Sequence, residues 1–190
     1  MLEKKYCIKD LEDVVLSSGE IESILQNMAS KISDDYQSLN LTILTIMNGS
    51  LYMTVDLIRM LKVSCQIESI KVNSYIGDEQ NEGEFFISND DMAFLKGRDV
   101  LVVDEIFDSG ITMKRVLEKL KLTSGLSSIR SAVLLMKNRI RDIDYIPDYI
   151  GINVEDDFLV GYGLDFFGNY RDLPSIGILK SDKMGGLNTR

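Results

Sequence analysis

Apolar runs alternate with helical segments along the chain. Runs such as TILTIM (residues 42–47) and VLVV (100–103) lack polar alternation, which is typical of strands covered on both faces. Between the runs, apolar residues recur at three- and four-residue spacing, as at Ile21, Leu25 and Ile32, and this periodicity predicts helices. The predicted strands cover residues 42–47, 64–75, 99–106 and 128–137, apolar segments 149–154 and 157–164 follow, and the predicted helices cover 21–36, 51–61 and 109–122.

This alternation predicts an α/β fold with a mostly parallel central sheet and helices on both of its faces. A length of 190 residues, scarce proline and the lack of a Gly/Ser linker indicate one domain over residues 1–190. Ligands bind such sheets beyond the carboxyl ends of the strands. Four polar loops fall there (NGS, NSY, DEIFDSGIT and MKNR), and we expect them to form one site.

Composition argues against several classes of function. A net charge of −9 does not suit a nucleic-acid surface, and the absence of histidine excludes Ser-His-Asp and Cys-His catalysis and argues against zinc. Any metal is therefore expected to be a hard cation held by oxygen, magnesium first. No apolar run approaches the ~20 residues of a membrane span. MLEKKYCIKD is not a signal peptide, and Cys7 and Cys65 form no metal or redox motif, so we expect a cytoplasmic protein with reduced thiols.

The stretch VLVVDEIFDSGITM (100–113) is the strongest indication of chemistry. An ATPase strand, a signalling receiver strand and a phosphoribosyl-binding loop can all begin in this way. The ATPase interpretation lacks its G-x-x-x-x-G-K-[ST] loop, and a receiver would carry its acidic pair after the first strand. Helix capping by Asp108 and Ser109 leaves Asp104 and Glu105 without a role. Small residues between a strand and a helix suit a phosphate, because backbone N–H groups and the helix dipole converge there.

The same stretch resembles the phosphoribosyl pyrophosphate loop of type I phosphoribosyltransferases. LTILTIMNGSLYMTVDLIRML, KVNSYIG, AVLLMKNR and PDYIGINVEDDFLVGYGLDFFGNYRDLPSIGIL are similar, in this order, to segments of hypoxanthine-guanine phosphoribosyltransferases, over about residues 40–180. The resemblance implies the type I phosphoribosyltransferase fold, with a small hood formed by N-terminal residues and about 150–180. It also implies purine salvage, in which a 5-phosphoribosyl group moves from phosphoribosyl pyrophosphate to N9 of hypoxanthine or guanine, giving IMP or GMP and pyrophosphate.

The resemblance further implies roles for individual residues. Asp108 would be the catalytic carboxylate, moving a proton at purine N7. The implied phosphoribosyl-binding residues are Asp104, Glu105, Asp108, Ser109, Gly110, Ile111 and Thr112. The implied purine-binding residues are Lys137, Phe158, Leu159 and Asp165. Pyrophosphate would bind Asn48 and Gly49, in a loop of unusual peptide geometry, and Arg171; magnesium would bind at Asp104, Glu105 and Asp165.

Some of these features have simpler explanations. A strand-end Lys137 is often a solvated lysine and Phe158 a core aromatic, so only the resemblance favours contact with the base. The acidic segment 75–91, rooted at Ser74 and Tyr75, is interpreted as a mobile loop over the reacting centre, with an ordinary surface loop or hairpin as the alternative. Residues 180–190 are expected to be disordered.

Three features depart from the pattern of the family. Asn48 and Ile111 stand where relatives often have lysine, and the acidic pair is Asp-Glu where Glu-Asp is usual. We interpret these differences as tuning of activity. The alternatives are a homologue that binds nucleotide without turnover, or a phosphate-binding signalling domain. A homodimer or homotetramer is expected, and the preference among hypoxanthine, guanine and xanthine stays open.

Overall fold

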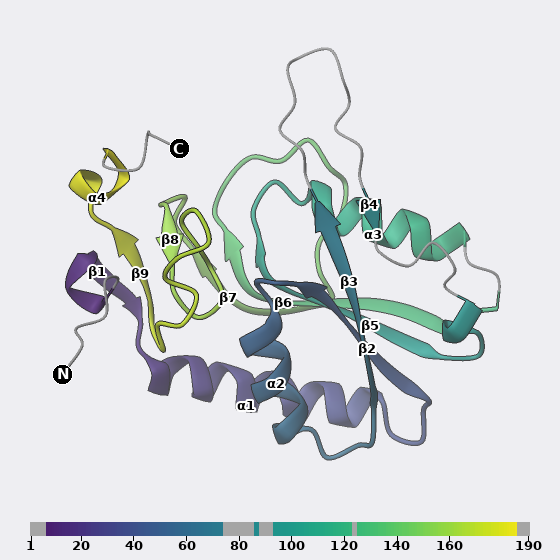
Figure 1. Ribbon diagram of the computed structural model, residues 1–190. Coiled ribbons are helices and arrows are strands. Elements are labelled where there is room, and N and C mark those ends of the chain that lie inside the picture. The colour runs from purple at the N-terminus through teal and green to yellow at the C-terminus, as the bar shows by residue number, and fades with distance from the viewer. Residues whose placement is uncertain (1–6, 74–85, 88–92, 123–124, 186–190) are drawn as a thin grey trace, which may run out of the picture.

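Five parallel strands form the centre of the larger sheet, and they arise from the apolar runs of the sequence. The computed structural model describes residues 7–73, 86–87, 93–122 and 125–185. The strand order is β4-β3-β2-β5-β6-β7, and β4 (Phe86–Ile87) is antiparallel to β3 (Figure 1). The parallel strands are β2 (Leu41–Met47), β3 (Gln66–Asn73), β5 (Asp99–Phe107), β6 (Ser128–Lys137) and β7 (Tyr149–Val154). The predicted mostly parallel sheet is confirmed.

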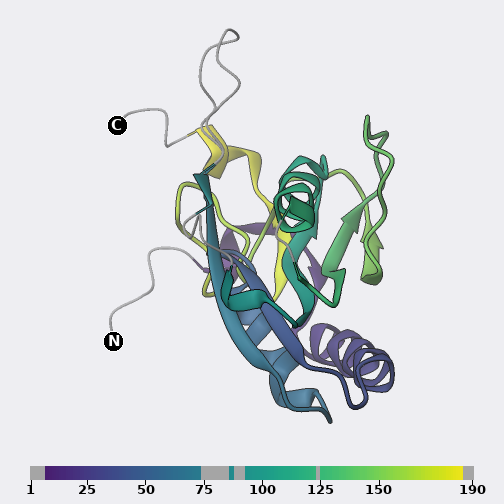
Figure 2. The same ribbon diagram turned by 90° about the vertical axis from the view of Figure 1, so that its right-hand side faces the viewer.

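Helices cover both faces of this sheet. α1 (Ser18–Asp35) and α2 (Leu51–Met60) lie on one face and α3 (Ile111–Leu122) on the other, as Figures 1 and 2 show. In β5, Leu101 and Val103 pack toward α1 and α2, whereas Val100 and Val102 pack toward α3. Because both faces are buried, the strand carries no polar alternation.

Helix α1 begins three residues before the predicted start at Ile21. The Glu20 carboxylate accepts a hydrogen bond from the Ser17 N–H at 2.8 Å, and the Ser17 hydroxyl accepts one from the Glu20 N–H at 3.3 Å. This reciprocal capping box satisfies backbone donors of the first turn and fixes the start of the helix. No described helix has the length and apolar character needed to cross a membrane.

A second, small sheet is built from terminal parts of the chain. Its antiparallel order is β1-β9-β8, with β1 (Leu11–Leu16), β9 (Ile176–Leu179) and β8 (Leu159–Val160). The hood expected from about 150–180 therefore starts at β8, because β7 belongs to the large sheet. The apolar segment 157–164 is a strand only at 159–160, since Gly161, Tyr162 and Gly163 all have positive φ and turn the chain.

Three short helices complete the described chain: η1 (Ile8–Asp10), η2 (Ala93–Leu95) and α4 (Ser181–Gly185). The expectation of disorder over residues 180–190 is wrong for α4. Lys183 in this helix forms an ion pair with Asp10, with 3.1 Å between Nζ and Oδ1. The two ends of the described chain are thereby joined beside the small sheet.

Candidate active site

The loop after β2 is held by hydroxyl groups beneath it. The Thr45 hydroxyl lies 2.6 Å from that of Ser50 and 2.8 Å from that of Thr54, and Ser50 donates to the Ile46 carbonyl at 2.7 Å. All these hydroxyls are buried, so they fix the turn from β2 into α2 from inside. The peptide bond between Met47 and Asn48 is cis, which confirms the unusual peptide geometry expected of this loop.

The carboxylates of Asp104 and Glu105 lie at the end of β5. Burial and the neighbouring charge of Glu105 raise the pKa of Asp104 well above its usual range. Burial also raises the pKa of Glu105, although the neighbouring Asp104 carboxyl group and, to a smaller extent, the Arg171 guanidinium act in the opposite direction. Glu105 Oε2 is buried and has no hydrogen-bond partner among the described residues. Buried carboxylates with raised pKa values are typical of a functional site.

Two glycines let the first loop approach these acids. A Cβ atom on Gly49 would overlap the Glu105 carboxylate, and a Cβ atom on Gly163 would overlap the Gly49 carbonyl oxygen. Gly163 also has φ +101°, a conformation that favours glycine. The loop after β2 is therefore enclosed between the end of β5 and the turn after β8.

The turn between β5 and α3 supplies a phosphate-binding geometry. It runs from Asp108 through Ser109 to Gly110, whose φ is +79° and whose added Cβ would contact the Phe107 ring at 2.7 Å. Helix α3 begins at Ile111, and the Gly110 carbonyl accepts its first helical hydrogen bond from Lys114 N–H at 3.0 Å. The Ile111 N–H donates to the Ser109 hydroxyl at 3.4 Å, and the other N–H groups of the first turn have no partner within the helix and suit an anion.

The turn after β8 brings one more acid and one cation to the same place. Arg171 NH2 lies 2.6 Å from Asp165 Oδ1, and Asp165 Oδ2 accepts a hydrogen bond from the Gly168 N–H at 2.7 Å. Arg171 also donates to the Gly163 carbonyl. The guanidinium is thereby fixed beside the turn that encloses Gly49.

These segments line one cleft of about 320 Å³ at the carboxyl ends of β2 and β5. Ten of the residues predicted to bind the substrate or metal line it: Asn48, Gly49, Asp104, Glu105, Asp108, Ser109, Gly110, Thr112, Asp165 and Arg171. Residues from three separate segments thus meet where a parallel sheet binds ligands.

Comparison with known proteins agrees with this geometry. A family model described as a phosphoribosyl transferase domain matches residues 13–166. The chain belongs to the phosphoribosyltransferase family. It is 36% identical over 174 residues to the hypoxanthine-guanine phosphoribosyltransferase of Staphylococcus epidermidis, covering 92% of this chain and 97% of that protein. The corresponding Staphylococcus aureus protein is 34% identical over 173 residues, covering 91% and 96% of the two chains.

The fold agrees as well. A crystal structure of a hypoxanthine phosphoribosyltransferase from Staphylococcus aureus superimposes with a TM-score of 0.86 at 32% identity, covering 95% of this chain and 98% of that one. The type I phosphoribosyltransferase fold is therefore confirmed, including the small antiparallel sheet from terminal strands.

In this phosphoribosyltransferase, Lys137 contacts the cleft through Asp108. Its Nζ lies 3.3 Å from Asp108 Oδ2, and only 11% of its side chain is exposed, so it is not the solvated strand-end lysine of the simpler explanation. Arg139 reaches the other oxygen of Asp108, with 2.5 Å between NH1 and Oδ1. The general-base candidate therefore lies between two cations.

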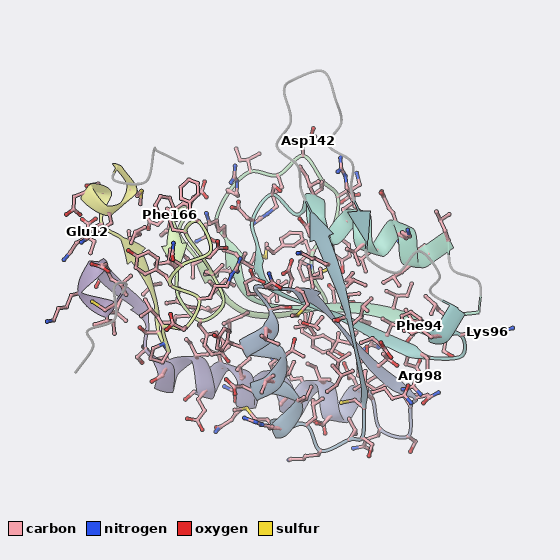
Figure 3. All side chains as sticks on the ribbon, in the orientation of Figure 1. Glu12, Phe94, Lys96, Arg98, Asp142 and Phe166 are labelled. Atoms are coloured by element: carbon pink, nitrogen blue, oxygen red, sulfur yellow. The ribbon has the colours of Figure 1, made fainter. Side chains whose placement is uncertain are left out.

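Four predicted residues lie away from the cleft lining. Ile111 is 48% exposed on the first turn of α3, and Leu159 is buried in β8. Phe158 is 44% exposed, so it is not the core aromatic of the simpler explanation, and it packs edge-to-face against Phe166, which is labelled in Figure 3. The fourth is Lys137, described above. Ser74 and Tyr75 lie outside the described residues, as does most of the predicted mobile segment, and β4 is the part of it that the structure describes.

Two arginines of the site were given no individual role in the sequence prediction, although Arg139 belongs to the MKNR loop that was expected at the site. Arg139 contacts Asp108, and Arg141 donates to the carbonyls of Asp108 at 2.6 Å and Phe107 at 3.0 Å, and to that of Lys137. Its guanidinium also lies 5.0 Å from the centre of the Phe107 ring. The signal was available, because MKNRIR places two arginines directly after a strand end that already carried a candidate lysine.

Proposed function

We propose that the protein transfers the 5-phosphoribosyl group of phosphoribosyl pyrophosphate to N9 of hypoxanthine or guanine, as a purine-salvage enzyme. In this reaction N9 forms a bond to C1′ of the ribose while the bond from C1′ to pyrophosphate breaks, and pyrophosphate leaves with the electron pair. The observation that carries the proposal is the single cleft in which acids, a helix N-terminus and an arginine meet.

The phosphate and the sugar would lie along the β5–α3 turn. Ser109, Gly110 and Thr112 line the cleft at the start of α3, where N–H groups and hydroxyls suit the 5-phosphate. Asp104 and Glu105 are placed to accept hydrogen bonds from the ribose hydroxyls. Their negative charge would also stabilise the positive charge that develops on the sugar in the transition state.

The base would bind between Asp108, Lys137 and Phe158. Lys137 would donate to the 6-oxo group, and adenine would be disfavoured because its 6-amino group is itself a donor. Asp108 would accept the proton that the purine loses on forming the new bond. Phe158 offers an exposed ring for stacking, and Leu159 would offer backbone groups to the edge of the base.

The leaving pyrophosphate would contact the first loop and Arg171. The guanidinium fork matches phosphate oxygens, and the backbone at Asn48 and Gly49 lines the same cleft. Among the described residues that line the cleft, Arg171 is the one cation against four carboxylates, so a free pyrophosphate group would meet net negative charge from them.

The donor set fits magnesium. Carboxylate oxygens are its preferred ligands, and Glu105 Oε2 is a buried oxygen without a partner among the described residues. The described part of the chain has no group of three or more side chains that could hold a metal alone, as expected for an ion that binds one or two carboxylates together with substrate phosphates. Asp104 and Glu105 would hold one ion, and Asp165 would lie by a second ion at the pyrophosphate. When bound, magnesium neutralises charge on the leaving pyrophosphate.

A homodimer or homotetramer is proposed on a separate observation. Leu51 and Tyr52, directly after the first loop, are 41% and 38% exposed at the start of α2. Neighbouring exposed apolar side chains of this kind favour a protein contact. Light scattering coupled to size exclusion measures the state, and a monomer at micromolar concentration would contradict the proposal.

The function is tested by incubating the purified protein with phosphoribosyl pyrophosphate, magnesium and one base at a time, with nucleotide detected by chromatography. IMP and GMP are expected, with loss of product in EDTA and in the Asp108→Asn variant. Asn48, which lines the cleft in place of a lysine, favours one alternative, a homologue without turnover. Binding of phosphoribosyl pyrophosphate with no nucleotide from any base would establish that alternative and refute the enzyme.

A further inference from the structure

Four charged side chains at the ends of β5, β6 and β7 form a closed ring of alternating sign. Lys137 Nζ lies 3.3 Å from both Asp108 Oδ2 and Asp156 Oδ1. Arg139 NH1 lies 2.5 Å from Asp108 Oδ1 and 3.6 Å from Asp156 Oδ1, the oxygen that Lys137 also contacts. Each cation thus contacts both acids, and each acid contacts both cations.

The backbone holds the ring in place on both sides. The Asn138 N–H donates to the Val154 carbonyl at 2.7 Å, and the Asn138 side chain donates to Glu155 Oε1 at 3.1 Å. These bonds join the segment after β6 to the segment after β7, so that Asp156 faces the two cations. On the opposite side, Arg141 holds the carbonyls of Asp108 and Lys137.

Two members of the ring keep a hydrogen-bonding group that the ring does not use. An ammonium has three N–H donors, and the two acids engage two of them, so one remains on Lys137. Each carboxylate oxygen has two lone pairs, so Asp108 can accept another hydrogen bond while both cations stay in contact with it. A free donor and a free acceptor therefore lie side by side. A 6-oxopurine carries the complementary acceptor and donor at O6 and at N7–H.

We propose that Arg139 and Asp156 are positioning residues for base binding, which close the charge ring and thereby fix Lys137 and Asp108 at the spacing of the O6–N7 edge. The proposal rests on the proposed function, because it names the residues that support its base site. Arg139 fixes the carboxylate and Asp156 fixes the ammonium. Without Arg139 the Asp108 side chain, and without Asp156 the Lys137 side chain, would gain rotamer freedom, which has to be lost again when the base binds.

The test compares Arg139→Ala, Arg139→Lys, Asp156→Ala and the Arg139→Ala/Asp156→Ala double variant with wild type. Arg59→Ala is the matched control, because Arg59 is an exposed arginine on α2 outside the ring. Steady-state kinetics give KM for hypoxanthine at saturating phosphoribosyl pyrophosphate, and KM for phosphoribosyl pyrophosphate at saturating base. Calorimetry gives the Kd of IMP, and thermal unfolding establishes that each variant is folded.

Arg139→Ala is expected to raise the KM of hypoxanthine and the Kd of IMP about tenfold, equivalent to ~1.4 kcal/mol. The KM of phosphoribosyl pyrophosphate should stay within about twofold, and Arg139→Lys should restore part of the loss, because it restores the charge without the fork. The double variant should lose little more than the worse single variant, since the ring acts as a unit.

Two results would refute the proposed positioning role of Arg139 and Asp156. One is an Arg139→Ala enzyme that matches Arg59→Ala in base KM and IMP affinity. The other is a loss shared equally by base and phosphoribosyl pyrophosphate, which would indicate general disruption of the cleft. A wild-type protein that forms no nucleotide but binds IMP would refute the enzyme and leave the ring testable through IMP affinity. A wild type that neither binds IMP nor forms nucleotide would refute both.

Discussion

Glu105→Gln should stabilise the free protein while lowering its activity. In the wild type, Glu105 Oε2 is buried without a hydrogen-bond partner among the described residues. Burial disfavours the charged form and raises the pKa of this carboxyl group. The ionised carboxylate therefore costs folding free energy, which the variant avoids by carrying no charge at this position.

The size of the effect follows from the contacts. A buried polar group left unpaired costs ~1–3 kcal/mol, and more when it is charged, so the Gln side chain, which stays buried, avoids only the excess due to the charge. Arg171 offsets part of this cost by its attraction to the carboxylate, so we expect a gain of about 1–2 kcal/mol in the free energy of unfolding. For a chain of this length, that gain corresponds to a rise of about 2–8 °C in Tm.

The sign of the pH dependence is specific. Because the folded-state pKa is raised, ionisation costs nothing below about pH 4, where Glu105 is protonated in both states. The cost appears as the pH rises above the unfolded pKa and is complete once the pH exceeds the folded-state pKa. The advantage of Glu105→Gln should therefore be present at pH 8 and vanish near pH 4.

Thermal unfolding in EDTA without substrate measures this advantage, and kcat/KM for phosphoribosyl pyrophosphate, expected to fall at least about tenfold, measures its functional cost. Glu118→Gln, at an exposed position of α3, is the matched control and should change neither quantity. A Glu105→Gln protein that melts at or below the wild-type temperature at pH 8 would refute the reasoning.

Three further changes test other parts of the structure. Arg141→Met removes hydrogen bonds to three carbonyls. It should lower the free energy of unfolding by about 2–3 kcal/mol and lower kcat about tenfold or more. An unchanged midpoint of urea unfolding would contradict this prediction. Gly163→Ala combines positive φ with overlap on the Gly49 carbonyl, so Tm should fall and the KM of phosphoribosyl pyrophosphate should rise; retention of both would contradict the packing. A hydrogen bond from the Cys7 N–H and, to a smaller extent, the Lys183 ammonium lower the pKa of Asp10. Asp10 therefore stabilises the fold when the pH is above its unfolded pKa of ~3.9, and this stabilisation is lost as the pH falls through the folded-state pKa. Asp10→Asn should therefore melt below wild type at pH 7, and the gap should narrow in acid; a gap that stays constant down to pH 2.5 would refute this.

The central sheet and its acidic edge could be predicted because each depends on local pattern. An unalternated apolar run specifies a strand buried on both faces, and a parallel sheet places all its strand ends at one edge. The residues at the ends of β2 and β5 therefore met in one cleft as expected. The turn after β8 could be assigned to the site only through the family resemblance, because nothing in its periodicity indicates that Asp165 and Arg171 fold back toward the cleft.

The remainder depends on contacts between segments distant in the chain. Glycine at Gly49 is required by Glu105 and at Gly163 by Gly49 itself, and no local pattern of sequence reports such mutual packing. The small sheet has the same difficulty, since β1 pairs with a strand that lies far away at the other end of the described chain. Helix α4 could not be predicted because residues 181–185 have few apolar positions, and because its ion pair, between Lys183 and Asp10, joins residues that are far apart in the sequence.

The three acids between residues 104 and 108 lie in different environments, which suit them to different roles. Asp104 is buried and Glu105 is half-buried beneath the first loop, where burial of the carboxyl groups raises both pKa values and where a sugar or a metal would supply the missing partner. Asp108, three residues on, is 43% exposed and lies between the cations of Lys137 and Arg139. A carboxylate held by cations on two sides and with an open lone pair is positioned to accept a hydrogen bond from a base that enters beside it. The end of β5 divides these tasks because the chain leaves the sheet between Glu105 and Asp108, passing from the buried edge to the open side of the cleft.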